Sequence, residues 1–478
     1  MTRDRASNPL TDRYASREMS YLFSQDAKFR TWRRLWVALA EAEKELGLAI
    51  TDEQITELRQ SVSSINYEEA EKREREIRHD VMSHIHAYGL QAPSARGIIH
   101  LGATSAFVTD NADILLMAEA LALIEQRLVN LMAKLRAFAI EWRDTPTLAF
   151  THFQPAQLTT VGKRATLWLH DLLLDYREIE FRQGSLALLG VKGATGTQAS
   201  FLKLFDGDAG KVADLERLVA QKMGLERVYP VSGQTYSRKV DSMVVNALAG
   251  FGQSASKFAY DMRLLQHLRE IEEPFEEEQV GSSAMAYKRN PMRAERIDAL
   301  ARHLIVNAQN PALTAATQWF ERTLDDSANR RIAIPEAFLA ADAIALLYDN
   351  IIAGIVVHPE VIGANVRREL PFMATENLMM EGVRAGGDRQ LLHERVRVHS
   401  QAAAERLKEG SQDNDLYHRI AADPLFGLRP DTIEAFARPS AYTGLSAAQV
   451  DSFLENYIDP IMKERSSMIH GEPGEVRV

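Results

Sequence analysis

A long, unbroken stripe of apolar side chains between Thr109 and Trp142 constrains the fold of this chain most strongly. Its members follow one another at alternating intervals of three and four residues: Ile114, Met117, Leu121, Ile124, Leu128, Leu131, Leu135, Phe138 and Trp142. This spacing places every member on one face of an α-helix, for which Thr109 or Asp110 is the expected N-cap. At about 1.5 Å per residue the helix is on the order of 50 Å long, which is typical of a bundle of long helices.

Other segments carry helical signals as well. Residues 237–273, which precede the helix-breaking Pro274, and residues 160–183 both show apolar side chains at helical spacing. Asn290 and Pro291 open a further helix, because asparagine is a good N-cap and proline is favoured at the first helical position. Strand-like alternation is confined to a few short segments. The sequence therefore predicts an all-α protein.

We expect three helical domains. An N-terminal helical domain occupies residues 1–104, a long-helix bundle that includes the loop at 281–291 occupies residues 105–357, and a C-terminal helical domain occupies residues 358–478. Each apolar stripe is the expected core of its bundle. Because bundles of this length often bury such stripes against other subunits, we also expect a homo-oligomer with the central bundle at its core.

Composition and charge exclude several kinds of partner and site. The net charge of −10 over 478 residues argues against a nucleic-acid binder, which needs a basic surface. The chain has no cysteine, which excludes disulfides, thiolate nucleophiles, iron–sulfur clusters and cysteine-based zinc sites. Residues 1–13 lack the apolar core of a secretory signal, and no apolar run approaches the roughly 20 residues of a membrane span. We therefore expect a cytoplasmic protein without a membrane partner.

The first of four polar clusters spans residues 78–86. Its three histidines could suggest a metal site, but neither an HExxH pattern nor a cysteine accompanies them, so we expect no metal. His84 and His86 fall on different sides of a helix, so at least one of them is structural. The triplet Arg78, His79 and Asp80 forms a polar corner that suits a ligand.

The second polar cluster, at residues 102–105, comes immediately before the long helix. The hydroxyl groups of Thr104 and Ser105, together with free backbone N–H groups near a helix N-terminus, suit an anion such as a carboxylate or a phosphate. A simple helix-capping turn explains the same residues equally well. Both interpretations stay open at this point.

The third polar cluster, at residues 150–157, contains His152 between two aromatic residues and just before a proline. In this setting a histidine is by default a core residue with satisfied hydrogen bonds. The alternative is a general acid or base, because histidine is the side chain whose unperturbed pKa lies near neutrality. The local sequence does not decide between the two.

The fourth polar cluster is the loop at 281–291. Gly281 permits unusual backbone angles, two serines expose hydroxyl and N–H groups, and Lys288 and Asn290 add a cation and an amide close to a new helix. This collection suits the stabilisation of a substrate carboxylate while negative charge grows on it. A solvated linker is the alternative.

Two glycine-rich stretches could be mistaken for phosphate-binding loops. Residues 190–196 match neither the GxGxxG pattern nor the P-loop spacing, and residues 207–211 also lack the full phosphate-loop pattern. The sequence therefore carries no nucleotide-cofactor signature, and we expect no cofactor.

The run GSSAMAYKRNP at 281–291 resembles the GSSxMPxKxNP signature of the fumarase/aspartase superfamily. Further segments are similar to the adenylosuccinate lyase family within it, closest to its animal-type branch: 78–82, 100–105, 151–157, 288–293, 319–327 and 369–377. The likeness runs from about Arg13 into the C-terminal domain. Ala286 departs from it, because the family usually has proline there, which puts the rigidity of the loop in question but not its chemical groups.

This resemblance implies an all-helical homotetramer whose small-molecule substrates lose fumarate. The expected reactions are the cleavage of adenylosuccinate to AMP and fumarate and the cleavage of a succinylo-carboxamide ribotide (SAICAR) to its carboxamide (AICAR) and fumarate. Both belong to purine nucleotide biosynthesis. The resemblance also implies that each active site draws on three subunits of the tetramer.

The resemblance further implies a role for individual residues. Ser282 is the expected base, His152 the general acid, and His79 an assisting or binding residue. Lys288 and Asn290 are expected to hold the substrate carboxylate. The expected contacts to the ribose phosphate are Arg13, Tyr14, Arg322, Ser327 and Arg331. The remaining expected substrate contacts are Arg78, Asp80, Thr104, Ser105, Gln234 and Arg296.

Two other interpretations compete with this one. Another fumarate-releasing lyase of the superfamily, such as an argininosuccinate lyase, shares the fold and the serine loop. The segment from Arg322 to Arg331 argues against it, because that substrate needs no phosphate recognition. The second alternative is a non-catalytic structural relative, which would be free to lose Ser282, Lys288 or His152, and this chain keeps all three.

Overall fold

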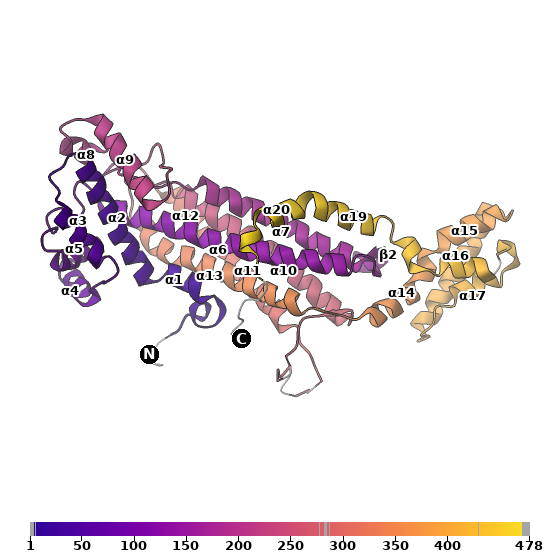
Figure 1. Ribbon diagram of the computed structural model, residues 1–478. Helices are drawn as coiled ribbons and strands as arrows, with labels where there is room; N and C mark the ends of the chain where they lie inside the picture. Colours follow the sequence, from indigo (N-terminus) through magenta and orange to yellow (C-terminus); the bar gives the residue numbers. More distant parts are fainter. Residues whose placement is uncertain are drawn as a thin grey trace.

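The computed structural model describes residues 4, 6–276, 278–281, 284, 285, 287–428 and 430–470. The molecule is elongated and mainly helical, with the N-terminal helices at one end, long helices in the middle and a group of shorter helices at the other end (Figure 1). This arrangement confirms the predicted all-α class with few and short strands.

Short and medium helices form the N-terminal end: η1 (Leu10–Tyr14), α1 (Arg17–Leu22), α2 (Gln25–Glu45), α3 (Asp52–Ser61), α4 (Tyr67–Ile77) and α5 (Asp80–Gln91). Two later helices, α8 (Ala199–Leu204) and α9 (Ala209–Met223), return to this end and lie beside α2 (Figure 1). The N-terminal helices are therefore covered by a segment more than 100 residues further along the chain.

Five long helices form the central bundle: α6 (Ser105–Glu141), α7 (Val161–Ser185), α10 (Lys239–His267), α11 (Met292–Asn307) and α13 (Asp325–Gly354), with the shorter α12 (Gln309–Thr317) beside them. The predicted stripe on α6 is buried from Ile114 to Phe138. On α7, Trp168 and Tyr176 are buried likewise, and the Trp168 indole N–H donates to Asp261 of α10 at 2.7 Å. The stripes are thus core within one chain.

Two of the expected helix starts are wrong. Helix α6 begins at Ser105 with Thr104 as its N-cap, so Thr109 and Asp110 lie inside the helix. Helix α11 begins after Pro291, and the Asn290 amide donates to the Gly281 carbonyl oxygen at 2.7 Å instead of capping the helix. Tertiary contacts therefore determine what these polar side chains bind.

The segment 237–273 is helical only as far as His267, well before Pro274.

Two small antiparallel sheets lie between the helical segments. Strands β1 (Pro146–Thr151) and β2 (Gln154–Thr160) pair with an irregularity between Ala149 and Phe150, and β3 (Ile271–Glu272) pairs with β4 (Val356–Val357). The β1–β2 hairpin begins and ends beside the C-terminal end of α6, because the Gly162 amide donates to the Trp142 carbonyl oxygen at 2.8 Å. Its tip therefore lies at the far end of the bundle from the N-terminal helices.

The C-terminal part consists of two groups. Helices that extend beyond the bundle come first: α14 (Pro359–Met373), α15 (Thr375–Arg384), α16 (Arg389–Lys408), α17 (Leu416–Ala421), η2 (Pro424–Phe426), α18 (Pro430–Phe436) and η3 (Pro439–Tyr442). The last helices return to the bundle: α19 (Ser446–Phe453), η4 (Leu454–Ile458), α20 (Asp459–Glu464) and η5 (Ser466–Met468). Arg465 connects these last helices to α7 and α6 through ion pairs with Glu180 at 2.6 Å and with Glu125 at 3.1 Å.

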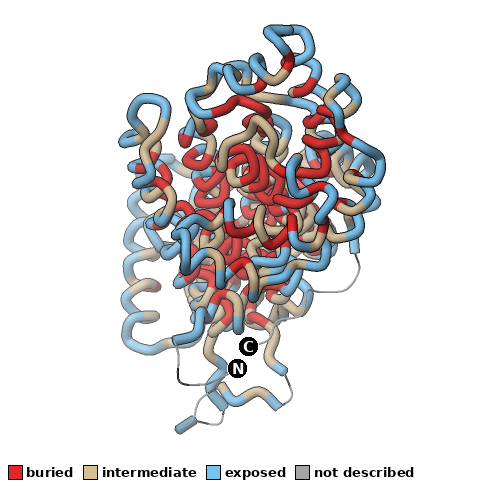
Figure 2. The backbone as a smooth tube through the Cα atoms, turned by 90° about the vertical axis from the view of Figure 1, so that its left-hand side faces the viewer, coloured by how far each residue is buried: buried red, intermediate tan, exposed pale blue. Residues whose placement is uncertain are grey.

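The buried side chains form two separate clusters. The larger cluster runs from Leu10 through the bundle to Ile458, and the smaller one lies within residues 374–433. Seen from the end of the molecule, the buried parts of the chain lie toward the middle and the exposed parts around them (Figure 2). The predicted boundaries at 104/105 and 357/358 stay predictions. The return of residues 446–468 to the bundle is a feature that the three-domain division did not include.

Helix α13 contains an 18-residue window that is apolar enough, by length and composition, to cross a membrane, which the sequence analysis did not single out. Within the described residues it is the one such helix, and 83% of the window is buried inside the protein. Burial on nearly all sides explains the apolar composition of a helix that lies at the centre of a bundle.

Glu43 on α2 is a fully buried carboxyl group, and neither of its oxygens has a hydrogen-bond partner among the described residues. Burial raises its pKa from 4.5 to about 9. Between those two values the folded protein holds a proton that the unfolded chain has released. The free energy of unfolding should therefore fall by about 1.4 kcal/mol for each pH unit as the pH rises from about 5 to 9.

We predict that Glu43→Gln removes this pH dependence, because glutamine is neutral and of similar shape. Chemical denaturation at pH 6 and pH 8.5 should show the variant gaining stability over the wild type as the pH rises. Glu53→Gln on the exposed side of α3 is the matched control. Identical pH slopes for wild type and Glu43→Gln would contradict a buried, protonated Glu43.

Candidate active site

A pocket of about 860 Å³ lies where the bundle meets the N-terminal helices. Helices α6, α10 and α13 all begin here, so three helix N-termini bring their positive ends to one place, which favours an anionic ligand. Eight of the sequence-predicted site residues line the pocket: Arg78, His79, Asp80, Ser105, Gln234, Arg322, Ser327 and Arg331. The structure therefore brings half of the predicted site together in one chain.

The corner between α4 and α5 orients a histidine toward α6. Arg78 ends α4 in a left-handed conformation with φ of 57°, which turns the chain sharply. The backbone N–H of Met82 donates to His79 Nδ1 at 3.3 Å, so a neutral His79 ring carries its proton on Nε2. That Nε2 lies 3.4 Å from the Ser105 hydroxyl, and Thr104 beside it makes no capping hydrogen bond. This corner favours the ligand-binding interpretation of residues 102–105.

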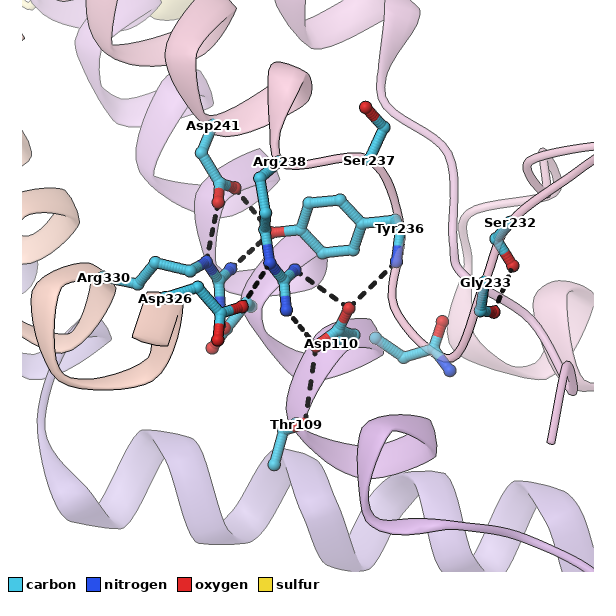
Figure 3. A network of polar contacts seen from close by, with 12 residues as sticks. Thr109, Asp110, Ser232, Gly233, Tyr236, Ser237, Arg238, Asp241, Asp326 and Arg330 are labelled. Atoms are coloured by element: carbon cyan, nitrogen blue, oxygen red, sulfur yellow. Dashed lines mark hydrogen bonds and ion pairs between the residues drawn. The ribbon is translucent and has the colours of Figure 1, made fainter. Parts of the chain in front are cut away.

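A buried ion-pair network forms one wall of the pocket (Figure 3). The Arg238 guanidinium donates two hydrogen bonds to Asp110, at 2.9 and 3.1 Å, and a third to Asp326 at 2.6 Å. All three side chains are at most 2% exposed. Burial alone would lower the pKa of Arg238, but Asp110 raises it above its ordinary value. The guanidinium is therefore charged, and it connects α6 to α13.

Arg330 extends the same network. It donates to Asp241 at 2.6 Å and to the Tyr236 hydroxyl, and it pairs with Asp113 at 2.9 Å. Burial opposes its charge, yet Asp241 and its neighbours raise the pKa of Arg330 well above its ordinary value. Burial raises the pKa of Asp113, while Arg330 counteracts that rise. The two buried arginines thus join α6, α10 and α13 at the level of the pocket.

The predicted pocket cations at the start of α13 are paired with carboxylates. Arg322 donates to both oxygens of Asp326 at 2.9 Å, and Arg331 donates to Asp80 at 3.0 Å. Gln234 is held by its backbone N–H, which donates to the Glu321 carbonyl oxygen at 2.9 Å. Asp326 is shared between Arg322 and the buried network, so the network positions a predicted phosphate contact.

Three predicted contacts lie elsewhere in the molecule. The Arg296 guanidinium lies 5.5 Å from the centre of the Tyr14 ring, and Arg13 lies 6.0 Å from the same ring. Next to this group, the Ser16 backbone N–H donates to the buried Asp342 of α13 at 2.7 Å. Asp342 is the eighteenth residue of the helix, so Arg13, Tyr14 and Arg296 lie about 25 Å along the bundle from its start.

The loop at 281–291 folds back on itself. A Cβ atom on Gly281 would lie 2.0 Å from the Lys288 carbonyl oxygen, so only glycine allows this approach. The Asn290 amide closes the loop onto Gly281, while the Lys288 side chain is exposed. The predicted base Ser282, the neighbouring Ser283 and the departing residue Ala286 lie outside the described residues.

His152 is not a core histidine. It lies at the tip of the β1–β2 hairpin, where His152 and Phe153 have φ of 54° and 58°, as a tight two-residue turn requires. Both side chains are exposed, Phe153 to 55%. The default interpretation of His152 as a buried residue is therefore wrong, and the ring is free to act on a ligand.

The predicted residues thus lie at different levels along the bundle, and three of these levels are far apart. The pocket lies at the start of α6, whereas His152 follows the end of α6, and the 37 residues of this helix span about 55 Å. Lys288 and Asn290 come after α10, which runs from the pocket end for 29 residues. A small molecule cannot touch all three levels of one chain.

One histidine of the first cluster, His84, lies in the protein core. Among the residues that the structure describes, no group of three or more potential metal ligands is present. His84 is buried and stacks on Phe29 with 3.7 Å between ring centroids, and burial lowers its pKa to about 4. It is therefore the structural histidine that the helical spacing predicted.

The pocket residues that sequence reasoning missed include seven charged side chains: Lys28, Glu74, Asp110, Asp113, Arg238, Asp326 and Arg330. A usable signal existed for two of them, because Asp110 and Asp113 interrupt the first turns of an otherwise apolar stripe. A carboxylate on the buried face of a helix needs a cationic partner. The identity of that partner, 128 residues away for Asp110, depends on the tertiary fold.

Comparisons with known proteins agree with this geometry. Residues 12–305 match the family model described as Lyase, and residues 371–453 match the one described as Adenylosuccinate lyase C-terminus. The chain is 50% identical to an adenylosuccinate lyase of Schizosaccharomyces pombe over 475 residues, covering 99% of this chain and 98% of the relative. It is 49% identical to the adenylosuccinate lyase of Saccharomyces cerevisiae over 478 residues, covering 99% of both chains.

A solved structure supports the same fold. The crystal structure of a fumarate lyase from Mesorhizobium sp. BNC1 superposes with a TM-score of 0.79 at 25% identity and covers 92% of this chain and 98% of that one. The proposed animal-type branch stays a prediction. The full-length identity, the two family matches and the shared helical fold together show that this chain belongs to the adenylosuccinate lyase family.

Proposed function

We propose that this chain cleaves adenylosuccinate to AMP and fumarate, and SAICAR to AICAR and fumarate. The observation that carries the proposal is the full-length identity of about one half to two adenylosuccinate lyases. The pocket agrees with a phosphorylated substrate, because arginines and a serine hydroxyl are suitable phosphate ligands. We further propose a cytoplasmic location and no resident cofactor.

The chemistry is a β-elimination. A base removes a proton from the succinyl carbon next to the carbon that bears nitrogen, the carbon–nitrogen bond breaks, and a double bond forms in fumarate. Charge grows on the adjacent carboxylate as the proton leaves, and the departing nitrogen needs a proton. Ser282 as base, Lys288 and Asn290 at the carboxylate, and His152 as general acid meet these needs.

The pocket residues, together with Arg13, Tyr14 and Arg296 from another level of the bundle, would hold the rest of the substrate. Arg322, Ser327 and Arg331 are the proposed contacts to the phosphate, with Arg13 and Tyr14 beside the ribose phosphate. Arg78, His79, Asp80, Thr104, Ser105, Gln234 and Arg296 are the remaining proposed contacts. For Arg322 and Arg331 to bind a phosphate, the anion has to share or replace their present partners, Asp326 and Asp80.

We propose that a complete site is assembled from different subunits of a homotetramer. The separation of about 55 Å between the two ends of α6 supports this proposal, because only another subunit can bring a hairpin tip to the pocket end. An exposed apolar stripe on α7 supplies a surface for such contacts: Leu167, Leu174 and Phe181, each at least 51% exposed and seven residues apart. The tip residue Phe153 is exposed as well.

We predict that His152→Gln and Lys288→Met each lower kcat for fumarate release from adenylosuccinate by about 10²- to 10⁴-fold, because each removes a group that acts only as the bond breaks. A spectrophotometric assay of fumarate formation measures this. The matched controls, His393→Gln and Lys408→Met, change exposed residues of α16 and should retain full activity. Wild-type protein that releases fumarate from argininosuccinate instead would overturn the proposed substrate.

We also predict that mixed tetramers of His152→Gln and Ser282→Ala subunits regain activity. Two inactive subunits that contribute different residues to one site can together build some intact sites. Subunit exchange should be verified by native mass spectrometry before the assay. Complete exchange without recovered activity would count against shared sites.

A further inference from the structure

Lys28 in the first turns of α2 faces the pocket, together with Ser24 and Gln25 of the same helix end. Its ammonium group lies over two aromatic rings, with Nζ 4.9 Å from the centre of the Trp32 ring and 5.2 Å from that of Phe29. Trp32 is fully buried, so this contact fixes the side chain on the pocket wall.

Most cationic side chains of the pocket are paired with a carboxylate, whereas Lys28 has no such pair among the described residues. Six cationic and five carboxylate side chains line the pocket. The four arginines from α13 and its surroundings are each paired with a carboxylate: Arg238, Arg322, Arg330 and Arg331. Within the described part of the chain, Lys28 and Arg78 have no carboxylate at ion-pair distance. The ammonium of Lys28 is therefore available to an anionic ligand.

The surroundings of Lys28 make a bound anion favourable. Burial lowers the pKa of Lys28, and the nearby positive charge of Arg331 lowers it further. Asp113, Asp80 and Glu74 act in the opposite direction but more weakly. An anion between Lys28 and Arg331 would stabilise both positive charges, because without an anion the two cations repel each other.

We propose that Lys28 is a further ligand of the substrate phosphate and acts together with Arg331. This inference rests on the function proposed above. The phosphate is the fitting anion because Lys28 lines the same pocket as the proposed phosphate contacts Arg322, Ser327 and Arg331. The groups proposed for the succinyl carboxylates, Lys288 and Asn290, lie at the other end of the bundle within the same chain.

The test compares two ligands that differ only in the phosphate, AMP and adenosine, on the full-length enzyme. Isothermal titration calorimetry or inhibition of adenylosuccinate cleavage measures both affinities. Lys28→Met, which keeps the packing against Trp32, should weaken AMP binding by about 10- to 100-fold, as the loss of a charge-assisted hydrogen bond predicts. Adenosine binding should stay within about twofold of the wild type, and Lys28→Arg should retain most of the AMP affinity.

Lys72→Met on the exposed side of α4 is the matched control and should leave both affinities unchanged. Melting temperature and elution volume identify variants that misfold, in which case Lys28→Gln takes the place of Lys28→Met. Equal weakening of AMP and adenosine would overturn the inference, because it indicates a structural role. Unchanged AMP binding, or weakened inhibition by fumarate alone, would overturn it too.

The same measurements separate this inference from the proposed function. Wild-type protein that releases fumarate and binds AMP more tightly than adenosine supports the function, whatever the Lys28 variants do. Wild-type protein that does neither would overturn the proposed function and, with it, the role of Lys28.

Discussion

The buried pairing of Arg238 with Asp110 and Asp326 is the interaction on which the site depends. Three charged side chains, each almost fully shielded from solvent, satisfy one another through three hydrogen bonds. Removing one partner would leave a buried charge without compensation, which costs about 3–5 kcal/mol. Because the partners come from α6, from the segment before α10 and from α13, the network also fixes where these three helices begin.

That placement gives the pocket its electrostatic character. The N-terminal ends of α6, α10 and α13 converge on the pocket, and the cations that line it are already oriented by carboxylates. Asp326 serves both the buried Arg238 and the pocket residue Arg322. The proposed phosphate contact Arg322 is thus positioned through Asp326 by the buried Arg238. Lys28 comes from α2 and, among the described residues, has no carboxylate at ion-pair distance.

Helix length supports the proposal that a complete site needs more than one chain. A helix of 37 residues separates the pocket from the His152 hairpin, and a small substrate cannot bridge about 55 Å. The exposed tip of the hairpin and the exposed apolar stripe on α7 are the features of one chain that a neighbouring subunit would cover. The proposed tetramer therefore connects the fold directly to the reaction.

The sequence by itself determined the helices and the chemical inventory. Apolar spacing of three and four residues is a local pattern, and it predicted α6, α7 and α10 together with their buried faces. The signature at 281–291 and the segments around Arg78, Ser105 and Arg322 identified the family, and this resemblance pointed to eight residues that share one pocket. In contrast, the N-cap predictions for Asp110 and Asn290 were wrong. Each side chain instead forms a hydrogen bond with a residue outside the helix that it was expected to cap.

Only the tertiary structure decided which charges meet. Arg238 and Asp110 are 128 residues apart, and no periodic pattern encodes their pairing. The exposure of His152 depended on a turn with two positive φ angles, and the position of Lys28 depended on the packing of α2 against the pocket. Secondary structure follows from neighbours along the chain, whereas a binding site follows from contacts between distant segments, whose energies depend on burial and geometry.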